Sequence, residues 1–480
     1  MSMAPLPSRD VQTEQQPERV HVTWINSDRR IPTRFVRPLL RFTHIEAAGG
    51  LVLLIAAAVA LFWANAPFGE SYERFWETHF EFALGPVHLE ETFRELVNDG
   101  LMAIFFFVVG LEIKRELVRG DLRDPKAAAL PAIAALGGML VPALLYISIS
   151  GGGDATRGWG IPMATDIAFS VGVVALLGSR VPVGGKLFLL ALAIVDDIGA
   201  ITVIAVFYTE QLFMGHLGAA IGGLVVVWVA QRVGIRSLAF YVPVGVITWF
   251  FLLESGVHAT LAGVALGLLT PAVSWYSDTE YHDKAQGLIN RYDFQSRAPR
   301  GADRVDHTAM ALSSVARESV PPLNRLEEAL HPWSSFFIVP IFALANAGVR
   351  FAGIDLVEAA THPVSLGVAT GLLVGKMFGI SLFTWLAVRL GLGKLPKFTT
   401  WRHIIGLAAV AGIGFTVSLF VTVLAFDDPF LSDRARTGIF IGSFLAGVVG
   451  YLILRSCRPT AAPAPPSDSA DTAPRPTPVS

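Results

Sequence analysis

The sequence predicts an all-α membrane protein with twelve transmembrane helices. Of its 480 residues, 53% are hydrophobic and only 16% are charged, whereas soluble domains carry about 25% charged residues. Apolar windows of about twenty residues, the length that crosses a bilayer as a helix, recur along the chain. The loops between these windows alternate between basic and acidic. A chain so poor in charge cannot give polar surfaces to the roughly three soluble domains that its length would allow.

We find twelve such windows, the seventh to ninth of them short or closely spaced. Weak polar periodicity within the windows favours helices packed on one another over a β-barrel. Their approximate limits are 45–65, 96–118, 127–148, 158–179, 187–208, 213–231, 238–254, 257–271, 333–349, 366–387, 404–425 and 436–455.

The charged residues of the loops predict that both termini lie in the cytoplasm. Basic residues precede the first window, from Arg29 to Arg41, and follow the last window at Arg455 and Arg458. The loop 66–95, in contrast, is mostly acidic. Cytoplasmic loops of membrane proteins carry an excess of Lys and Arg. Twelve spans keep this alternation of basic and acidic loops to the end of the chain.

Composition divides the chain into an N-terminal arm, a helical domain and a C-terminal tail. Residues 1–43 form a polar cytoplasmic N-terminal arm without the apolar core of a removable signal peptide. We expect the twelve-helix domain over 44–456, with a long cytoplasmic loop at 272–331 that is either disordered or regulatory. The segment 457–480 is rich in Pro, Ala, Ser and Thr, which is typical of a disordered tail. In the first outer loop, apolar and polar residues alternate over 79–91, which predicts a β-hairpin. An irregular loop is an equal alternative.

Charge and cysteine content exclude other classes of protein. The net charge of −2 argues against a nucleic-acid partner. The single cysteine, Cys457, excludes intrachain disulfides and metal sites built from several cysteines.

Four ionisable residues lie near the middle of their windows: Asp166, Asp196, Asp197 and Lys376. A charged residue at that depth costs about 2.5–3.5 kcal/mol on insertion scales. One lysine can neutralise one aspartate, and a buried salt bridge that orients helices is the simplest interpretation. Three acids against one base leave an excess of negative charge, which favours a cation site.

Asp196 and Asp197 cannot form one shared pair on a helix, because neighbouring residues point about 100° apart. One of them can face a cavity while the other faces a partner such as Lys376. Carboxylate oxygens are the ligands that hard cations prefer. Sodium and protons would then compete for the same oxygens, which is the minimal chemistry of an exchanger.

Two windows carry residues that interrupt helices. Gly158, Gly160 and Pro162 precede Asp166, and Gly412 and Gly414 lie at the centre of their own window. Interrupted helices in both halves of a transporter indicate a binding site. The stretches 167–171 (IAFSV) and 413–417 (IGFTV) are also alike, which favours an internal repeat. Ordinary small-residue packing of helices is the alternative.

Five stretches carry a resemblance to a known family. With ATDIAFSVGVVALLG, ALAIVDDIGAITVIAVFYT, LVNDGLMAIFFFVVGLEIKREL, GLLVGKMFGI and GIGFTVSLF, the chain resembles the NhaA-type sodium/proton antiporters from about residue 43 to 455. The resemblance implies a fold in which the third to fifth and tenth to twelfth helices are inverted repeats. It also implies two discontinuous helices that cross near mid-membrane.

The resemblance assigns roles to the buried charges. It implies that Asp197 is the main cation and proton carboxylate and that Asp196 pairs with Lys376. These two aspartates would hold the transported sodium ion transiently. Asp166, with Thr165 nearby, would balance the partial positive charges at the starts of the broken helices.

Further residues match the family's regulatory positions. Asp99 would be an auxiliary acid, and His258 matches a histidine linked to the pH response. A packing histidine is the alternative for His258. Asn324 and Glu328 stand where the family's well-studied type has lysine and histidine, so the funnel is more acidic here. The cytoplasmic pH-sensing funnel, for which a helix-end charge cluster is the alternative, would comprise Glu112, Arg115, Glu116, Arg325 and Glu327.

The function implied is electrogenic, pH-regulated exchange of exported sodium or lithium for protons by alternating access, serving pH homeostasis. The resemblance further implies a multi-pass protein of the cell inner membrane, a homodimer formed through the 79–91 hairpin, no enzymatic activity and no resident cofactor. A sodium-coupled symporter of an organic anion on the same architecture is the alternative. An intramembrane aspartyl protease fits less well, because its Tyr-Asp and Gly-x-Gly-Asp motifs are missing.

Overall fold

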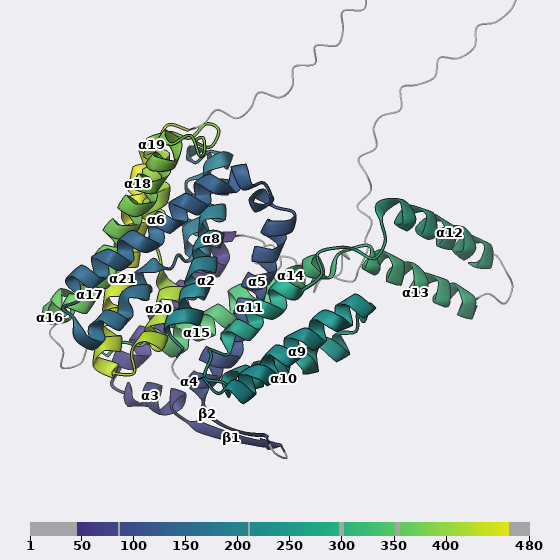
Figure 1. Ribbon diagram of the computed structural model, residues 1–480, viewed down its shortest axis with the longest axis horizontal. Coiled ribbons are helices and arrows are strands. Elements are labelled where there is room, and N and C mark those ends of the chain that lie inside the picture. The colour runs from purple at the N-terminus through teal and green to yellow at the C-terminus, as the bar shows by residue number, and fades with distance from the viewer. Residues whose placement is uncertain (1–45, 85–86, 210–211, 297–301, 351–355, 460–480) are drawn as a thin grey trace, which may run out of the picture.

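The computed structural model describes residues 46–84, 87–209, 212–296, 302–350 and 356–459. The chain is a bundle of helices with a short hairpin at one end and a pair of helices that projects from its side (Figure 1). The predicted N-terminal arm and nearly all of the predicted tail lie outside the described residues.

Within the described residues, eight helical segments are long and apolar enough to cross a membrane. Three of them contain a π-helical turn (η3, η7, η8), where backbone hydrogen bonding is locally rearranged. The eight segments are α2 (Glu46–Asn65), α4–η3–α5 (Phe93–Glu95, Leu96–Leu101, Met102–Val118), α6 (Pro125–Ile149), α8 (Val183–Phe207), α9 (Met214–Val233), α14–η7–α15 (Pro322–Trp333, Ser334–Ile338, Val339–Asn346), α17–η8–α18 (Pro363–Thr370, Gly371–Gly375, Lys376–Arg389) and α21 (Pro429–Arg455).

Two further windows contain bent pairs of helices, and two contain shorter apolar helices. Each pair bends by 47° at its break, so the two interruptions expected from glycine and proline are present. Each of the twelve predicted windows therefore contains helix, while the number of membrane crossings stays a prediction. The bent pairs are η5–α7 (Gly153–Met163, Ile167–Leu176) and α19–α20 (Trp401–Val410, Phe415–Ala425), and the shorter helices are α10 (Leu238–Leu253) and α11 (Thr260–Leu269).

Glycines bring α6 and α18 into backbone contact. A Cβ on Gly137 would lie 2.4 Å from the carbonyl oxygen of Gly379, and one on Gly379 would lie 2.2 Å from that of Gly137. Real Cβ atoms do not approach so closely, so both positions need glycine. This contact fixes α18, the helix that begins at Lys376, against the middle of α6.

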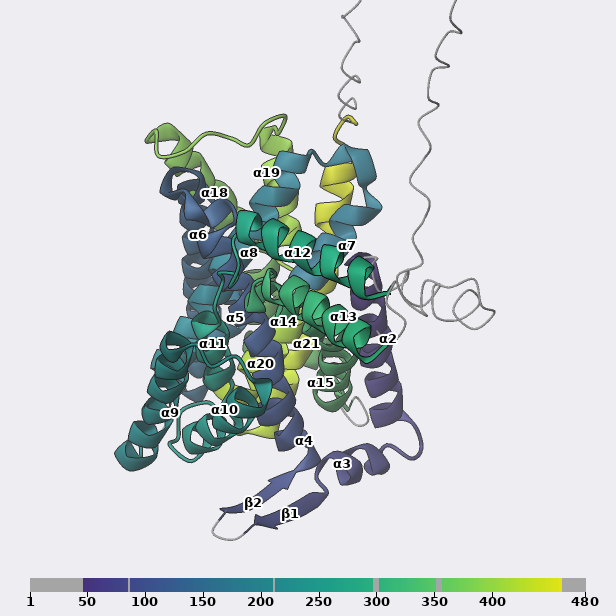
Figure 2. The same ribbon diagram turned by 90° about the vertical axis from the view of Figure 1, so that its right-hand side faces the viewer.

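Residues 79–92 form the predicted β-hairpin (Figure 2). Strands β1 (His79–Leu84) and β2 (Val87–Thr92) are antiparallel, with His79 opposite Thr92 and Leu84 opposite Val87. The short helix α3 (Glu70–Trp76) precedes the hairpin. The side chain of Thr92 caps the next helix by accepting a hydrogen bond from the backbone N–H of Glu95. The hairpin prediction is confirmed, although its tip at 85–86 is outside the described residues.

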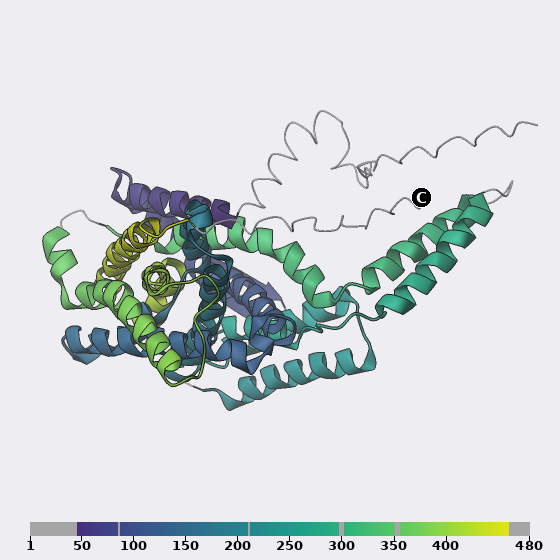
Figure 3. The same cartoon turned by 90° about the horizontal axis from the view of Figure 1, so that it is seen from above.

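The segment 272–331, expected as a long loop, contains two helices and the beginning of a third. Helices α12 (Asp278–Ser296) and α13 (Ala302–Glu318) pack side by side and project from the bundle (Figures 1 and 3). Helix α14 already begins at Pro322, eleven residues before the predicted window at 333. Hydropathy missed this start because the first turns of α14 are polar. Short elements elsewhere are η4 (Asp121–Arg123), η6 (Gly178–Arg180) and α16 (Leu356–Thr361).

Candidate functional site

The two bent pairs touch each other at their breaks. The backbone N–H of Asp166 donates to the carbonyl of Ile413 over 2.6 Å. The hydroxyl of Thr165 donates to the carbonyl of Ala411 over 2.9 Å. A helix break leaves backbone groups without their usual partners. Here each break supplies partners for the other, so both can persist in the interior of the bundle.

Two serines reinforce this contact in a reciprocal way. Ser170, the fourth residue of α7, donates to the carbonyl of Val410 at the end of α19 over 3.1 Å. Ser418, the fourth residue of α20, donates to the carbonyl of Ile161 near the end of η5 over 2.7 Å. Matched by helix position, Ser170 corresponds to Ser418. The similar stretches 167–171 and 413–417 align Ser170 with Thr416 instead, so the structural correspondence is shifted by two residues.

Asp166 lies between the starts of α7 and α20. Its Oδ1 accepts the N–H of Phe169 at 3.2 Å, which caps α7. Its Oδ2 accepts the N–H and the hydroxyl of Thr416 at 3.2 Å and 2.5 Å. Helix N-termini carry partial positive charge and favour anions. One carboxylate therefore serves two helix starts at once.

Asp196 and Lys376 form a fully buried ion pair. Asp196 lies at the middle of α8, and Lys376 is the first residue of α18 after a π-helical turn. The lysine Nζ lies 2.5 Å from Oδ2 of Asp196 and donates to the hydroxyl of Thr165 over 2.7 Å. The two charged side chains are 1% and 0% exposed. In the described part of the chain, Oδ1 of Asp196 is buried without a hydrogen-bond partner.

Asp197 is buried but has no hydrogen-bond or ion-pair partner among the residues that the structure describes. It follows Asp196 on α8, so its side chain leaves the helix in another direction. It interacts electrostatically with Glu112 on α5, and α5 packs on α8 through Ile113 and Ile194. The site thus contains one neutralised aspartate and one uncompensated aspartate.

The structure brings together four of the five predicted funnel residues. Arg115 on α5 forms an ion pair with Glu327 on α14, and its Nε lies 3.4 Å from Oε1 of Glu116. Glu112 interacts electrostatically with this group. Arg325 is different, because its nearest acid is Glu318, 3.8 Å away at the end of α13.

Asp99 and His258 lie on other elements. Asp99 belongs to the π-helical turn η3, and its backbone carbonyl accepts the indole N–H of Trp249 over 2.9 Å. His258 lies between α10 and α11, with Nε2 2.8 Å from the carbonyl oxygen of Tyr208.

Sequence reasoning missed two groups of contacts. Thr416 lies in a stretch that was compared with 167–171, yet nothing in that comparison indicates a bond to Asp166. Glu318 forms ion pairs with Arg236 and Arg325, and its backbone carbonyl accepts the N–H of Trp275. The sequence does not indicate these contacts, because charged residues in a polar segment are usually exposed to solvent.

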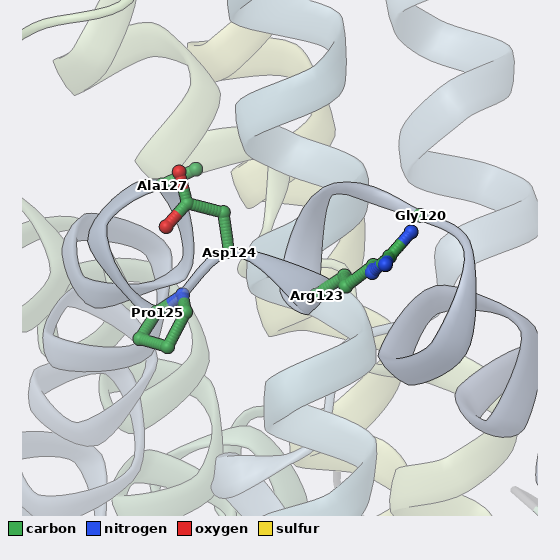
Figure 4. A pocket seen from close by; sticks show the side chains of 5 residues that line it. All are labelled: Gly120, Arg123, Asp124, Pro125 and Ala127. Atoms are coloured by element: carbon green, nitrogen blue, oxygen red, sulfur yellow. The ribbon is translucent and has the colours of Figure 1, made fainter.

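A surface pocket at the α5–α6 connection is separate from these aspartates. Gly120, Arg123, Asp124, Pro125 and Ala127 line it (Figure 4). Asp124 is engaged locally, since its Oδ1 accepts the N–H of Lys126 at 3.0 Å and caps α6. Within the described ranges, no group of three or more His, Cys, Asp or Glu is arranged to hold a metal ion.

Comparison with known proteins decides the family. The family model described as Na+/H+ antiporter 1 matches residues 40–454. The chain belongs to this family. Among its relatives, Na(+)/H(+) antiporter NhaA 2 of Sorangium cellulosum is 47% identical over 439 residues, covering 90% of this chain and 93% of that protein. Na(+)/H(+) antiporter NhaA of Syntrophobacter fumaroxidans is 44% identical, with 88% and 90% covered. The NhaA antiporter of Rhodopirellula baltica is 46% identical, with 88% and 94% covered.

Membership of the Na+/H+ antiporter 1 family confirms the resemblance found in the sequence. Together with the apolar helices of the bundle, it makes the chain a multi-span membrane antiporter. A solved sodium proton antiporter of Methanocaldococcus jannaschii matches over 88% of this chain and 97% of that one, with a TM-score of 0.44 and 15% identity.

Proposed function

We propose that this antiporter exports sodium or lithium in exchange for protons at Asp196 and Asp197. The observation that carries the proposal is the buried pair of Asp196 and Lys376 beside an Asp197 that has no partner in the described residues. An isolated buried carboxylate is costly, so it favours either a proton or a cation. This requirement makes sodium and protons alternative occupants of one site.

Lys376 determines how many protons leave when one sodium ion binds. A sodium ion that binds both carboxylates replaces the ammonium group as the positive partner of Asp196. Lys376 then becomes a buried cation without a counter-ion, which favours loss of its proton. Sodium also displaces the proton that Asp197 holds in its absence. One sodium ion would thus exchange for two protons, one from Asp197 and one from Lys376, which makes transport electrogenic.

The surrounding residues have supporting roles in this proposal. Asp166 balances the starts of α7 and α20, and Thr165 holds Lys376 toward Asp196. Asp99 is an auxiliary acid and His258 contributes to the pH response. The funnel residues Glu112, Arg115, Glu116, Arg325 and Glu327 regulate transport by pH.

We also propose that all twelve helical windows cross the inner membrane, with both termini in the cytoplasm. The third to fifth spans and the tenth to twelfth spans would be inverted repeats that alternate access to the site. The reciprocal bonds of Ser170 and Ser418 support this symmetry. The domain limits are the arm 1–43, the antiporter domain 44–456 with its insertion at 272–331, and the tail 457–480. The 79–91 hairpin would form a homodimer, since a hairpin edge can pair with a second copy.

The test is proton movement in everted membrane vesicles, followed with a pH-sensitive dye while sodium, lithium or potassium is added. We expect Asp197→Asn to abolish cation-driven proton movement, because the neutral amide cannot exchange a proton. The control is Asp427→Asn, which removes an exposed aspartate outside the site and should leave transport unchanged. Normal exchange by the Asp197→Asn variant would refute the assignment.

A further inference from the structure

Tyr208 connects the aspartate-bearing helix α8 to the first half of the broken helix. It is the residue directly after α8 and is only 3% exposed. Its hydroxyl donates to the carbonyl of Arg157 over 2.6 Å and accepts the N–H of Gly160 at 3.2 Å. Both of these backbone groups belong to η5. One hydroxyl therefore satisfies a donor and an acceptor on the segment that leads to Asp166.

Packing holds the tyrosine ring in place. The ring stacks on Trp159, with centroids 6.4 Å apart. A Cβ on Gly160 would lie 2.7 Å from the hydroxyl oxygen, so the ring fits against η5 only because this position is glycine. The contact has little freedom to slide, since the interior of a protein is close-packed.

The segment η5 needs such a partner. It is a 3₁₀ helix of eleven residues that contains Pro162, whereas 3₁₀ helices seldom exceed three or four residues. Proline has no backbone N–H. Hydrogen bonds from outside the segment are therefore needed to hold it in a single conformation.

Residues of α8 and its C-terminal end are connected to the bent pair η5–α7 at two points. At one point, Asp196 binds Lys376, which in turn binds Thr165 at the break. At the other, Tyr208 holds η5 upstream of the break. The two contacts fix the position of the break relative to the aspartates.

His258 supports Tyr208 from a third element. Its Nε2 lies 2.8 Å from the backbone carbonyl of Tyr208. A carbonyl can only accept, so Nε2 carries the proton and donates, in the neutral ring as well as in the charged one. The contact therefore restrains the end of α8 whether or not the ring is charged.

We infer that Tyr208 is a positioning residue for cation binding, which clamps η5 so that the break at Thr165 and Asp166 stays in register with Asp196 and Asp197. This inference rests on the proposed function. This role is distinct from that of the carboxylates, because the hydroxyl bonds to backbone groups of η5 and to neither aspartate. Its loss affects the site only through the geometry of η5.

The test is Tyr208→Phe, which keeps the ring and removes the hydroxyl. We expect the apparent KM for sodium to rise about fivefold to tenfold in vesicles, a size typical of losing a buried hydroxyl that makes hydrogen bonds. The maximal rate per folded protein should change less than twofold. A purely structural role would lower the amount of folded protein without changing the KM of the remainder. The control is Tyr241→Phe, which removes a similar bond to the carbonyl of Ile235 outside the site.

A second pair of variants covers the case in which Tyr208→Phe fails to fold. His258→Gln keeps an N–H donor for the carbonyl of Tyr208, whereas His258→Ala removes it. We expect the alanine variant to raise the sodium KM and the glutamine variant to restore it to within about twofold of the wild type. A wild-type KM in Tyr208→Phe, or in His258→Ala where Tyr208→Phe does not fold, would overturn the inference while leaving the proposed function intact. If wild-type vesicles show no sodium-driven proton movement at all, it is the proposed function that fails.

Discussion

Lys376 donates a hydrogen bond to the hydroxyl of Thr165 over 2.7 Å. That hydroxyl donates in turn to the carbonyl of Ala411, in the break of the opposite bent pair. The ammonium group of α18 is thereby linked to both interrupted helices as well as to Asp196 on α8. A change in the charge at Lys376 therefore acts on α8 and on the breaks of both bent pairs.

Replacing Lys376 by alanine should change both stability and coupling. Removal of one partner from a buried ion pair costs about 3–5 kcal/mol, because the other charge is left uncompensated. We therefore expect a lower thermal unfolding midpoint and, in liposomes, exchange that no longer responds to membrane potential. Lys186→Ala, at an exposed lysine, should leave both properties unchanged. Wild-type stability together with potential-dependent exchange in the Lys376→Ala variant would contradict the proposed role.

Thr416→Val tests the bridge between Asp166 and α20. The variant keeps the backbone N–H but loses the hydroxyl that donates to Asp166 over 2.5 Å. A buried group deprived of its partner costs about 1–3 kcal/mol, and we expect a loss of stability of this size with reduced transport. Thr416→Ser keeps the hydroxyl and should recover most of the loss. Equal stability of the valine and serine variants in thermal unfolding would show that this bond is unimportant.

Glu318 fixes the base of the projecting α12–α13 pair. Its carboxylate pairs with Arg236 and Arg325, and the guanidinium of Arg236 also lies over the ring of Trp275 at 4.5 Å. The three charged side chains are about one-quarter exposed, so solvent screening limits the effect on global stability to about 1 kcal/mol. We expect Glu318→Gln to speed limited proteolysis at the α12–α13 pair several-fold. Cleavage at the wild-type rate would show that other contacts hold this pair.

Glu91 makes the stability of the folded protein depend on pH at the hairpin. Burial, followed by the charges of Glu95 and Asp99, raises the pKa of Glu91 from 4.5 to about 7. The folded state therefore binds this proton more tightly than the unfolded state. The destabilisation due to Glu91 is absent below about pH 4.5, grows as the pH rises toward 7 and is complete above 7.

We expect Glu91→Gln to raise the thermal unfolding midpoint at pH 8 and to leave it nearly unchanged at pH 4, since the amide resembles the protonated acid. Glu90→Gln is the matched control, because Glu90 is exposed. A stabilisation of equal size at both pH values would mean that Glu91 does not titrate in this range.

Local sequence predicted most of the helical elements, and the reason is physical. Hydropathy over about twenty residues reports whether a segment can lie in lipid, so each predicted window contains helix. Gly412 and Pro162 act on their own helices, so the two breaks were also predictable. The early start of α14 and the α12–α13 pair were missed, because polar helices carry no such signal.

The sequence alone determined which residues were out of place, since three aspartates and a lysine in apolar windows need a reason to be there. Only the tertiary structure decided which of them meet. Lys376 and Asp196 are 180 residues apart, and Thr416 and Asp166 are 250 apart. Such contacts depend on how whole helices pack, through close approaches such as that of Gly137 and Gly379, and no local pattern encodes them. Three features follow from that packing: the lack of a hydrogen-bond partner for Asp197 within the described residues, the shared cap at Asp166 and the contact of Tyr208 with η5.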